Sequence, residues 1–277
     1  MRLPNWGGPD ILRRMSKLEN TFQSLKKSGK KALIPYIMAG DPDLETTLDL
    51  LKQLPGAGAD VIELGMPFTD PMADGPDIQE AGIRSLQNGT CLKDILKTVA
   101  AFRETNTDTP LILMGYFNPV FAYGVEQFCH DAAQAGVNGL LIVDIPPEEG
   151  SELWPHAKAA GLDVIRMITP TSKDQRLETV LKGTSGFLYY VSITGITGTA
   201  SAAPEKVKAH IDDIKSKTDL SVVVGFGIKT PDDAKAMAGI SSGVVVGSTL
   251  VRELNQSGVD ACLQKLRELR KGVDRAA

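Results

Sequence analysis

Apolar and polar positions alternate along the chain in blocks that match strands and helices in turn. Eight apolar runs have the length and β-branched content of strands that are buried on both faces. These runs are residues 32–39, 60–66, 110–117, 139–145, 163–168, 186–193, 221–226 and 242–246. Stretches with helical spacing lie between them, at residues 44–54, 77–87, 93–105, 125–135, 150–160, 173–182, 204–217, 231–238 and 256–271. Such regular alternation predicts a parallel sheet.

Eight β/α units in one domain favour an α/β fold of the (β/α)8 TIM-barrel type over an open doubly wound sheet. The chain has 277 residues, which suits a barrel of about 250 residues with additions. Ser16 and Glu19 form a capping-box pattern that predicts an extra N-terminal helix, ending near Gly29. We expect residues 1–15 to form a disordered extension and residues 16–277 to form one barrel domain.

Composition narrows the class of protein. The net charge of −4, from 30 basic and 34 acidic residues, argues against nucleic acid or an anionic membrane as a partner. No apolar run is long enough to span a bilayer, and the first 15 residues lack the apolar core of a signal peptide. Cys91, Cys129 and Cys262 are far apart, as expected for reduced thiols. We therefore expect a cytoplasmic location or, in an organelle, the plastid stroma.

Several kinds of chemistry have no support in the sequence. The apolar runs contain no lysine, and Lys229 lies only just past the seventh run, which disfavours an imine aldolase. The histidines, His130, His156 and His210, all fall in predicted helices outside the barrel, so they cannot form a histidine-rich metal site. Neither a Ser-His-Asp grouping nor a dinucleotide fingerprint is visible. Acid/base chemistry by carboxylates, on a ligand with a phosphate group, remains.

Residues 61–76 carry the candidate acid/base groups. Glu63 lies inside an apolar run, where a carboxylate is costly to bury unless it is paired, hydrogen-bonded or protonated. Desolvation raises a carboxyl pKa toward neutrality, where the group can give and take protons. Asp74 follows in a loop rich in proline and glycine, where we expect it to stay ionised. Position alone is equally compatible with a structural role for Glu63, as a buried carboxyl that is hydrogen-bonded by a neighbouring hydroxyl or backbone N–H. For Asp74, position alone favours the role of a turn residue.

Glycines after the last two predicted strands indicate a phosphate site. The seventh run leads into Gly225-Phe226-Gly227, and the eighth into Gly247-Ser248 before a short helix expected from residue 249. Glycines let backbone N–H groups approach an anion, and a helix N-terminus adds a favourable dipole. Barrels frequently bind phosphate at these two loops. The loop 194–203 is rich in small residues, which predicts a lid rather than an ordinary surface connection.

Three segments, in order, resemble the tryptophan synthase alpha chain family. They are PYIMAGDP at 35–42, ELGMPFTDPMADGP at 63–76 and GFGI at 225–228. The similarity runs from about Met15, where members usually begin, to near the C-terminus. The resemblance implies retro-aldol cleavage of indole-3-glycerol phosphate to indole and glyceraldehyde 3-phosphate, in the last steps of L-tryptophan biosynthesis. It thereby supplies the substrate, which the residues alone do not identify.

The resemblance also implies roles for individual residues. Glu63 matches the general acid/base, and Asp74 matches the carboxylate that binds the indole N–H. The expected substrate contacts are Tyr36, Tyr189, Thr197, Gly198, Phe226, Gly227, Gly247 and Ser248. Among them, Thr197 matches a threonine of the lid. The sequence departs from the family at Ile193 and Thr194, which replace polar types, and at Phe187, which replaces a tyrosine.

The family implies a partner as well. Its alpha chain works with a beta chain in an α2β2 assembly, and only the beta chain holds pyridoxal phosphate, so we expect no cofactor or metal in this chain. Interface candidates are Pro71, Asn118 and Pro146, in the loops after the second, third and fourth strands, although turn chemistry explains each of them equally well.

Two other functions compete with this one. A phosphosugar isomerase would need a second acid/base group on an opposite strand, for which Asp144 is the sole candidate. A non-catalytic subunit that binds a phosphate ligand and activates a partner enzyme is the alternative from another class. The presence of both Glu63 and Asp74 argues against that alternative.

Overall fold

The computed structural model describes residues 15–191, 204–225 and 227–276. Its strands form one parallel sheet in the order β5-β4-β3-β2-β1-β9-β8-β7-β6. The strands are β1 (Ala32–Met38), β2 (Ile62–Gly65), β3 (Leu111–Gly115), β4 (Gly139–Ile142), β5 (Asp163–Val164), β6 (Arg166–Ile168), β7 (Phe187–Val191), β8 (Ser221–Gly225) and β9 (Gly243–Val246). Each lies within one of the predicted apolar runs, and residues 163–168 supply two strands instead of one.

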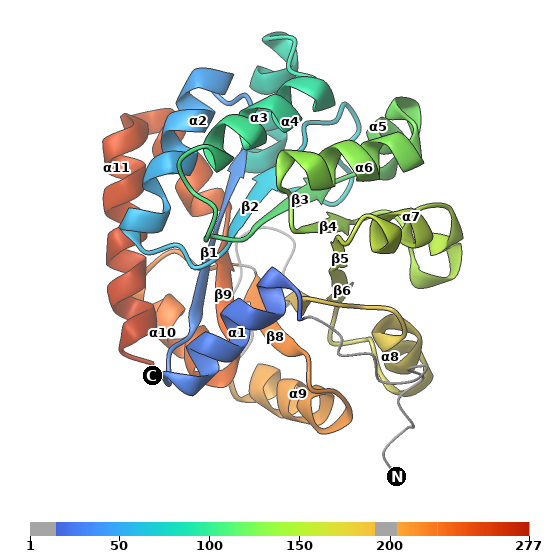
Figure 1. Cartoon of the computed structure of the whole chain (residues 1–277). Helices are drawn as coiled ribbons and strands as arrows, with labels where there is room; N and C mark the ends of the chain where they lie inside the picture. The colour runs from blue at the N-terminus through green and yellow to red at the C-terminus, as the bar shows by residue number, and fades with distance from the viewer. Residues whose placement is uncertain (1–14, 192–203, 226, 277) are drawn as a thin grey trace.

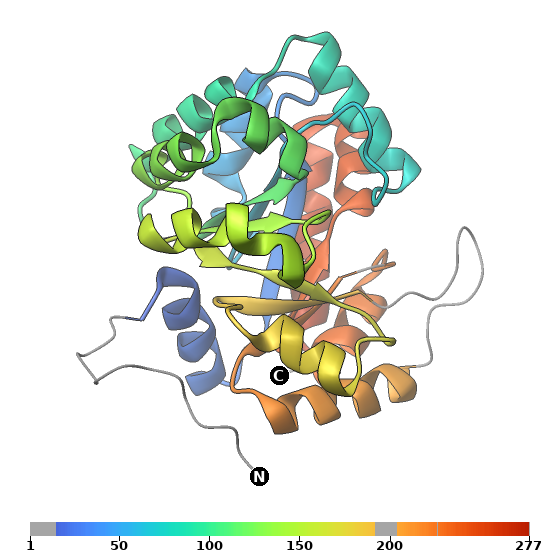
Figure 2. The same cartoon turned by 90° about the vertical axis from the view of Figure 1, so that its right-hand side faces the viewer.

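The strands β5 and β6 together occupy one position in the barrel. β5 pairs with β4, β6 pairs with β7, and Ile165 separates the two short strands. The Ile165 N–H donates to the carbonyl of Leu140 at 3.0 Å, which continues the ladder with β4 across the interruption. The two ends of the sheet therefore meet at this position. The predicted (β/α)8 barrel is confirmed, and helices surround its strands (Figures 1 and 2).

The helices follow the predicted alternation, with three differences. They are α1 (Lys17–Lys27), α2 (Leu44–Gln53), α3 (Pro76–Gln87), α4 (Leu92–Arg103), α5 (Phe117–Tyr123), α6 (Val125–Ala135), α7 (Trp154–Ala159), α8 (Asp174–Leu181), α9 (Pro204–Lys217), α10 (Pro231–Ile240) and α11 (Ser248–Asp274), with 3-10 helices η1 (Pro55–Ala57) and η2 (Pro147–Glu152). The helix expected at 150–160 is split into η2 and α7, because Pro155 stands at the start of α7 and cannot continue a preceding helix. α5 was not predicted. The two helices expected after β9 form α11, which is interrupted at Gly258, where φ is 83°.

Helix α1 closes the N-terminal end of the barrel. Its capping box is confirmed, since the Glu19 N–H donates to Ser16 Oγ at 3.1 Å and the Ser16 N–H donates to Glu19 Oε2 at 2.9 Å. Phe22 is buried against Phe187, the first residue of β7, with ring centroids 5.4 Å apart. Figure 1 shows α1 lying across the beginning of the strands. The apolar face of α1 thus completes the barrel interior.

The core has an inner and an outer part. On β1, Ile34 and Tyr36 belong to the cluster inside the barrel, whereas Leu33 and Ile37 pack outward against the helices. This alternation explains why the strands read as continuous apolar runs. None of the described helices combines the length and the apolar character needed to cross a membrane.

Candidate active site

Glu63 is the second residue of β2 and lies inside the barrel. It is in register with Tyr36 on β1 and Ile112 on β3, both of which belong to the inner cluster. The side chain is fully buried, and within the described part of the chain neither carboxyl oxygen has a hydrogen-bond partner. Desolvation, and then the charge of Asp74, raise the pKa of Glu63 from 4.5 to about 8. At neutral pH the group is therefore protonated.

Asp74 lies in the loop between β2 and α3, where Tyr116 holds it. The Tyr116 hydroxyl accepts a hydrogen bond from the Ala73 N–H at 3.0 Å and donates one to the Asp74 carboxylate. Burial raises the pKa of Asp74 from 3.8 to about 6, and the bond from Tyr116 opposes that rise. At neutral pH Asp74 is ionised while Glu63 is protonated. The structure thus places one acid and one anion at the mouth of one strand.

Two tyrosines flank this pair, and each needs a glycine opposite it. A Cβ atom on Gly65 would lie 2.1 Å from the Tyr36 hydroxyl oxygen, and one on Gly225 would lie 2.2 Å from that of Tyr189. Burial raises the pKa of both tyrosines well above 10, and the charges of Glu63 and Asp74 raise them further. Both phenols are therefore neutral hydrogen-bond donors beside the carboxyl pair.

Of the predicted phosphate residues, Gly247 and Ser248 lie at the N-terminus of α11. Gly247 is its N-cap residue, and its carbonyl accepts from the N–H groups of Leu250 and Val251, while no side chain caps the helix. Ser248 is exposed, and Gly227 adopts a φ of 75° with open space around it. The first-turn N–H groups of α11 can donate hydrogen bonds to an anion that binds there. Thr197, Gly198 and Phe226, together with the predicted lid and the departures at Ile193 and Thr194, lie outside the described residues.

The three interface candidates lie in the segments that follow β2, β3 and β4. Pro71 lies half-buried before Asp74, and Pro146 is exposed after β4. Asn118 is exposed on α5, so its assignment to a loop was wrong. Sequence reasoning missed the exposed apolar neighbours Met72 and Phe121, whose exposed fractions are 79% and 61%.

Tyr116 and Asp144 follow neighbouring strands, and of the two Tyr116 contacts the carboxyl pair. Tyr116 has a direct contact with Asp74 that sequence reasoning missed, although the residue lies near the end of the third predicted strand. The carboxylate of Asp144 accepts from the Phe117 N–H at 2.9 Å, so it caps α5. Asp144 follows β4, which is two positions from β2 in the strand order, so it is not on the strand opposite Glu63.

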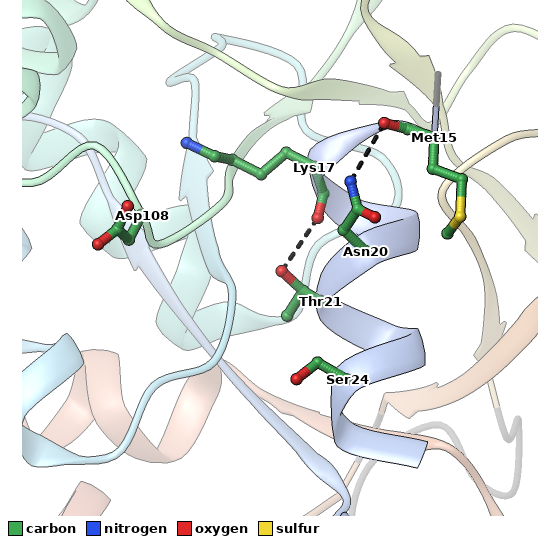
Figure 3. Close-up of a pocket in the computed structure, with 6 residues that line it drawn as sticks. All are labelled: Met15, Lys17, Asn20, Thr21, Ser24 and Asp108. Carbon is green, nitrogen blue, oxygen red and sulfur yellow. Dashed lines mark hydrogen bonds between the residues drawn. The ribbon is translucent and has the colours of Figure 1, made fainter. Parts of the chain in front are cut away.

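Figure 3 shows a different hollow of the surface, lined by Met15, Lys17, Asn20, Thr21, Ser24 and Asp108. These residues belong to α1, to the residues just before it and to the segment before β3, whereas Asp74 and Tyr116 follow the ends of their strands. The hollow therefore lies at the opposite end of the barrel from the carboxyl pair.

Comparison with known proteins identifies the family. The model of the tryptophan synthase alpha chain family matches residues 22–277. The chain belongs to this family. Tryptophan synthase subunit alpha from Legionella pneumophila str. Paris is 39% identical, with a TM-score of 0.88 over 94% of this chain and 99% of that one. A structure from Aquifex aeolicus VF5 is 35% identical, with a TM-score of 0.87 and coverage of 93% and 99%.

Tryptophan synthase from M. tuberculosis, in its aminoacrylate-bound form, is 31% identical, with a TM-score of 0.85 and coverage of 93% and 99%. The resemblance stated from the three sequence segments is thus confirmed. The chain has the role of a tryptophan synthase alpha subunit in tryptophan biosynthesis. The family is one of lyases whose members work with a beta subunit.

Proposed function

We propose that this chain cleaves indole-3-glycerol phosphate to indole and glyceraldehyde 3-phosphate. The supporting observation is the carboxyl pair, in which the pKa of Glu63 is about 8 and that of Asp74 is about 6. Over the pH interval between these values, Glu63 is ready to donate a proton and Asp74 carries a negative charge. Retro-aldol cleavage of this substrate needs these two states together.

Glu63 acts twice in the proposed reaction. Its carboxyl proton goes to C3 of the indole ring, which leaves the ring cationic at nitrogen and Glu63 as a carboxylate. Glu63 then takes the proton of the hydroxyl group on the adjacent carbon of the glycerol chain. The O–H electron pair forms the aldehyde C=O, and the pair of the broken C–C bond returns to the ring. Indole and the aldehyde leave, and Glu63 is protonated again.

Asp74 stabilises the ring cation in this scheme. Its carboxylate is held by Tyr116 and would accept the indole N–H, whose acidity rises as C3 is protonated. The phenols of Tyr36 and Tyr189, which are neutral, lie beside the Glu63–Asp74 carboxyl pair. The phosphate would bind at the first turn of α11, next to Gly247 and Ser248.

The test is indole release from indole-3-glycerol phosphate by the full chain, with and without a cognate beta chain. We expect Glu63→Gln to abolish release, and we expect Asp74→Asn to lower turnover far more than it weakens phosphate binding. Glu104→Gln, at an exposed position, is the matched control. Unchanged release by a folded Glu63→Gln protein would remove Glu63 from the mechanism. Ligand binding without release by the wild-type chain would instead favour the non-catalytic regulatory subunit.

We further propose an α2β2 assembly with a beta chain that alone holds pyridoxal phosphate. Pro71 and Pro146 lie on outer loops and Asn118 is exposed on α5, and the exposed side chains of Met72 and Phe121 add apolar surface on the same segments. The three cysteines are free, which supports a reducing compartment such as the cytoplasm or the plastid stroma.

A further inference from the structure

A side-chain pair joins helix α3, which follows the Asp74 loop, to helix α11, which begins at the predicted phosphate site. Arg252 is the fifth residue of α11, and Asp77 is the second residue of α3. The Arg252 guanidinium donates from Nε to Asp77 Oδ1 at 3.0 Å and from Nη2 to Oδ2 at 2.6 Å. Two parallel hydrogen bonds fix the relative orientation of the two groups as well as their separation. We call this contact the α3–α11 clamp.

On the α3 side, the clamp is tied to Asp74. This residue directly precedes Gly75, the N-cap residue of α3. The Gly75 carbonyl accepts from the N–H groups of Ile78 and Gln79 at 3.1 and 3.0 Å, which closes the first turn of the helix. The side-chain amide of Gln79 donates back to the Asp74 carbonyl at 2.8 Å. A shift of the first turn of α3 therefore moves the backbone that carries the Asp74 carboxylate.

On the α11 side, the clamp is tied to the predicted phosphate site. Arg252 lies about one helical turn beyond Ser248, the first residue of α11. Helices α3 and α11 pack against each other, and Ile78 of α3 and Val251 of α11 are both buried in the cluster inside the barrel. Asp77 occupies two donors of the Arg252 guanidinium and offsets its charge. This arrangement suits Arg252 to hold α3 in place rather than to bind an anion itself.

We propose that the α3–α11 clamp sets the spacing between the phosphate site and Asp74, so that Arg252 and Asp77 are positioning residues for a substrate held at both ends. The inference rests on the proposed function, which assigns the phosphate to α11 and the indole N–H to Asp74. A ligand that spans both sites gains affinity from both only when they stand at the separation of its two ends. A ligand that occupies one site does not depend on that separation.

The test compares a ligand that spans both sites with a ligand that occupies one. The spanning ligand is 3-(indol-3-yl)propyl phosphate, which lacks the hydroxyl groups of the substrate and cannot be cleaved, and the other ligand is inorganic phosphate. Binding of each to the full chain is followed through the backbone amide NMR resonance of Ser248. Both clamp side chains are partly exposed, and such ion pairs shift an equilibrium by about fivefold at most.

For Arg252→Met we expect the dissociation constant of the spanning ligand to rise about fivefold, while that of inorganic phosphate changes by less than about twofold. The kcat/KM for indole release should fall in parallel with the affinity for the spanning ligand. The double variant Arg252→Met/Asp77→Asn, which restores the net charge, should bind the spanning ligand no more weakly than Arg252→Met, because the two residues act through one contact.

Arg275→Met is the matched control. Arg275 is the C-cap residue of α11 and pairs with Asp232 at 2.9 Å. Its side chain is 52% exposed, against 46% for Arg252. Loss of this pair removes the same charge at the far end of the same helix, so we expect it to leave the affinities for both ligands unchanged.

Three results would overturn the positioning role. One is unchanged affinity for the spanning ligand in a folded Arg252→Met protein. Another is equal weakening of both ligands, which would show that Arg252 contacts the phosphate itself. The third is failure of the wild-type chain to bind the spanning ligand, which would count against the proposed function as well. Absence of indole release by a wild-type chain that binds the spanning ligand would refute the lyase activity alone, because the two-ligand comparison still decides the role of the clamp.

Discussion

Replacement of Glu63 by glutamine should make the protein more stable at alkaline pH while it removes cleavage. The carboxyl is fully buried and has no hydrogen-bond partner in the described residues, and its pKa is about 8 instead of 4.5. The folded protein therefore keeps a proton that the unfolded chain loses in this interval. Wherever the folded state binds more protons, the free energy of unfolding falls as pH rises.

The magnitude follows from the two pKa values. The contribution of Glu63 to wild-type stability does not change with pH well below 4.5, and it decreases from there until the pH passes about 8. At about 1.4 kcal/mol per pH unit, the full loss is about 5 kcal/mol, of which about 3.5 kcal/mol falls between pH 5 and pH 8. Glutamine is neutral throughout. Its buried amide carries a desolvation cost of its own, but that cost does not change with pH.

Urea unfolding of both proteins at a series of pH values measures this difference. We expect the free energy of unfolding of Glu63→Gln, relative to wild type, to rise by about 3.5 kcal/mol from pH 5 to pH 8. Asp74 titrates in both proteins, so its contribution largely cancels. Glu104→Gln, at an exposed position, should show a flat difference. A flat difference for Glu63→Gln as well would refute the raised pKa and, with it, the acid that the mechanism requires.

Two further substitutions test the packing around the site. Gly65→Ala would place a methyl group 2.1 Å from the Tyr36 hydroxyl oxygen and should destabilise the fold by about 1–3 kcal/mol. Gly82→Ala in α3, where the new methyl group has room, should be neutral or stabilising. Similar melting temperatures for the two variants would contradict this reasoning. Arg84→Met would remove the two hydrogen bonds, at 2.7 and 2.9 Å, that the guanidinium donates to the carboxylate of Asp41, which is 2% exposed. Chemical denaturation should show that the free energy of unfolding falls by about 3–5 kcal/mol. Adding Asp41→Asn to Arg84→Met should restore part of this loss, because it removes the unpaired buried charge.

The barrel could be predicted from the sequence because both faces of each strand are buried. Runs such as 32–39 therefore show strand length and apolar content without ambiguity, and the helices between them carry start signals such as Asp43, which accepts from the Thr46 N–H at 2.7 Å. The details that failed depend on neighbours in space. The interruption at Ile165 arises because β5 pairs with β4 whereas β6 pairs with β7. Helix α5 is short, contains a proline, and lacks a clear division into a polar and an apolar face.

The candidate site could be predicted only in part. The position of Glu63 in an apolar run predicted its burial, whereas its raised pKa depends also on the lack of a described hydrogen-bond partner and on the charge of Asp74. The pKa of Asp74 was not predictable in the same way, because its burial and its bond from Tyr116 arise from the path of a loop. The α3–α11 clamp joins Arg252 and Asp77, which are far apart in the sequence, through tertiary packing.

Unequal burial, and a hydrogen bond that only Asp74 receives, set the order in which the two carboxyl groups ionise. Both are desolvated, and the charge of Asp74 raises the pKa of Glu63. Asp74 receives a hydrogen bond from Tyr116, which stabilises its charged form, while Glu63 has no described donor and keeps its proton. Once Asp74 is ionised, its charge makes the second ionisation harder still. The same arrangement that costs folding stability at Glu63 therefore keeps an acid and an anion together at neutral pH.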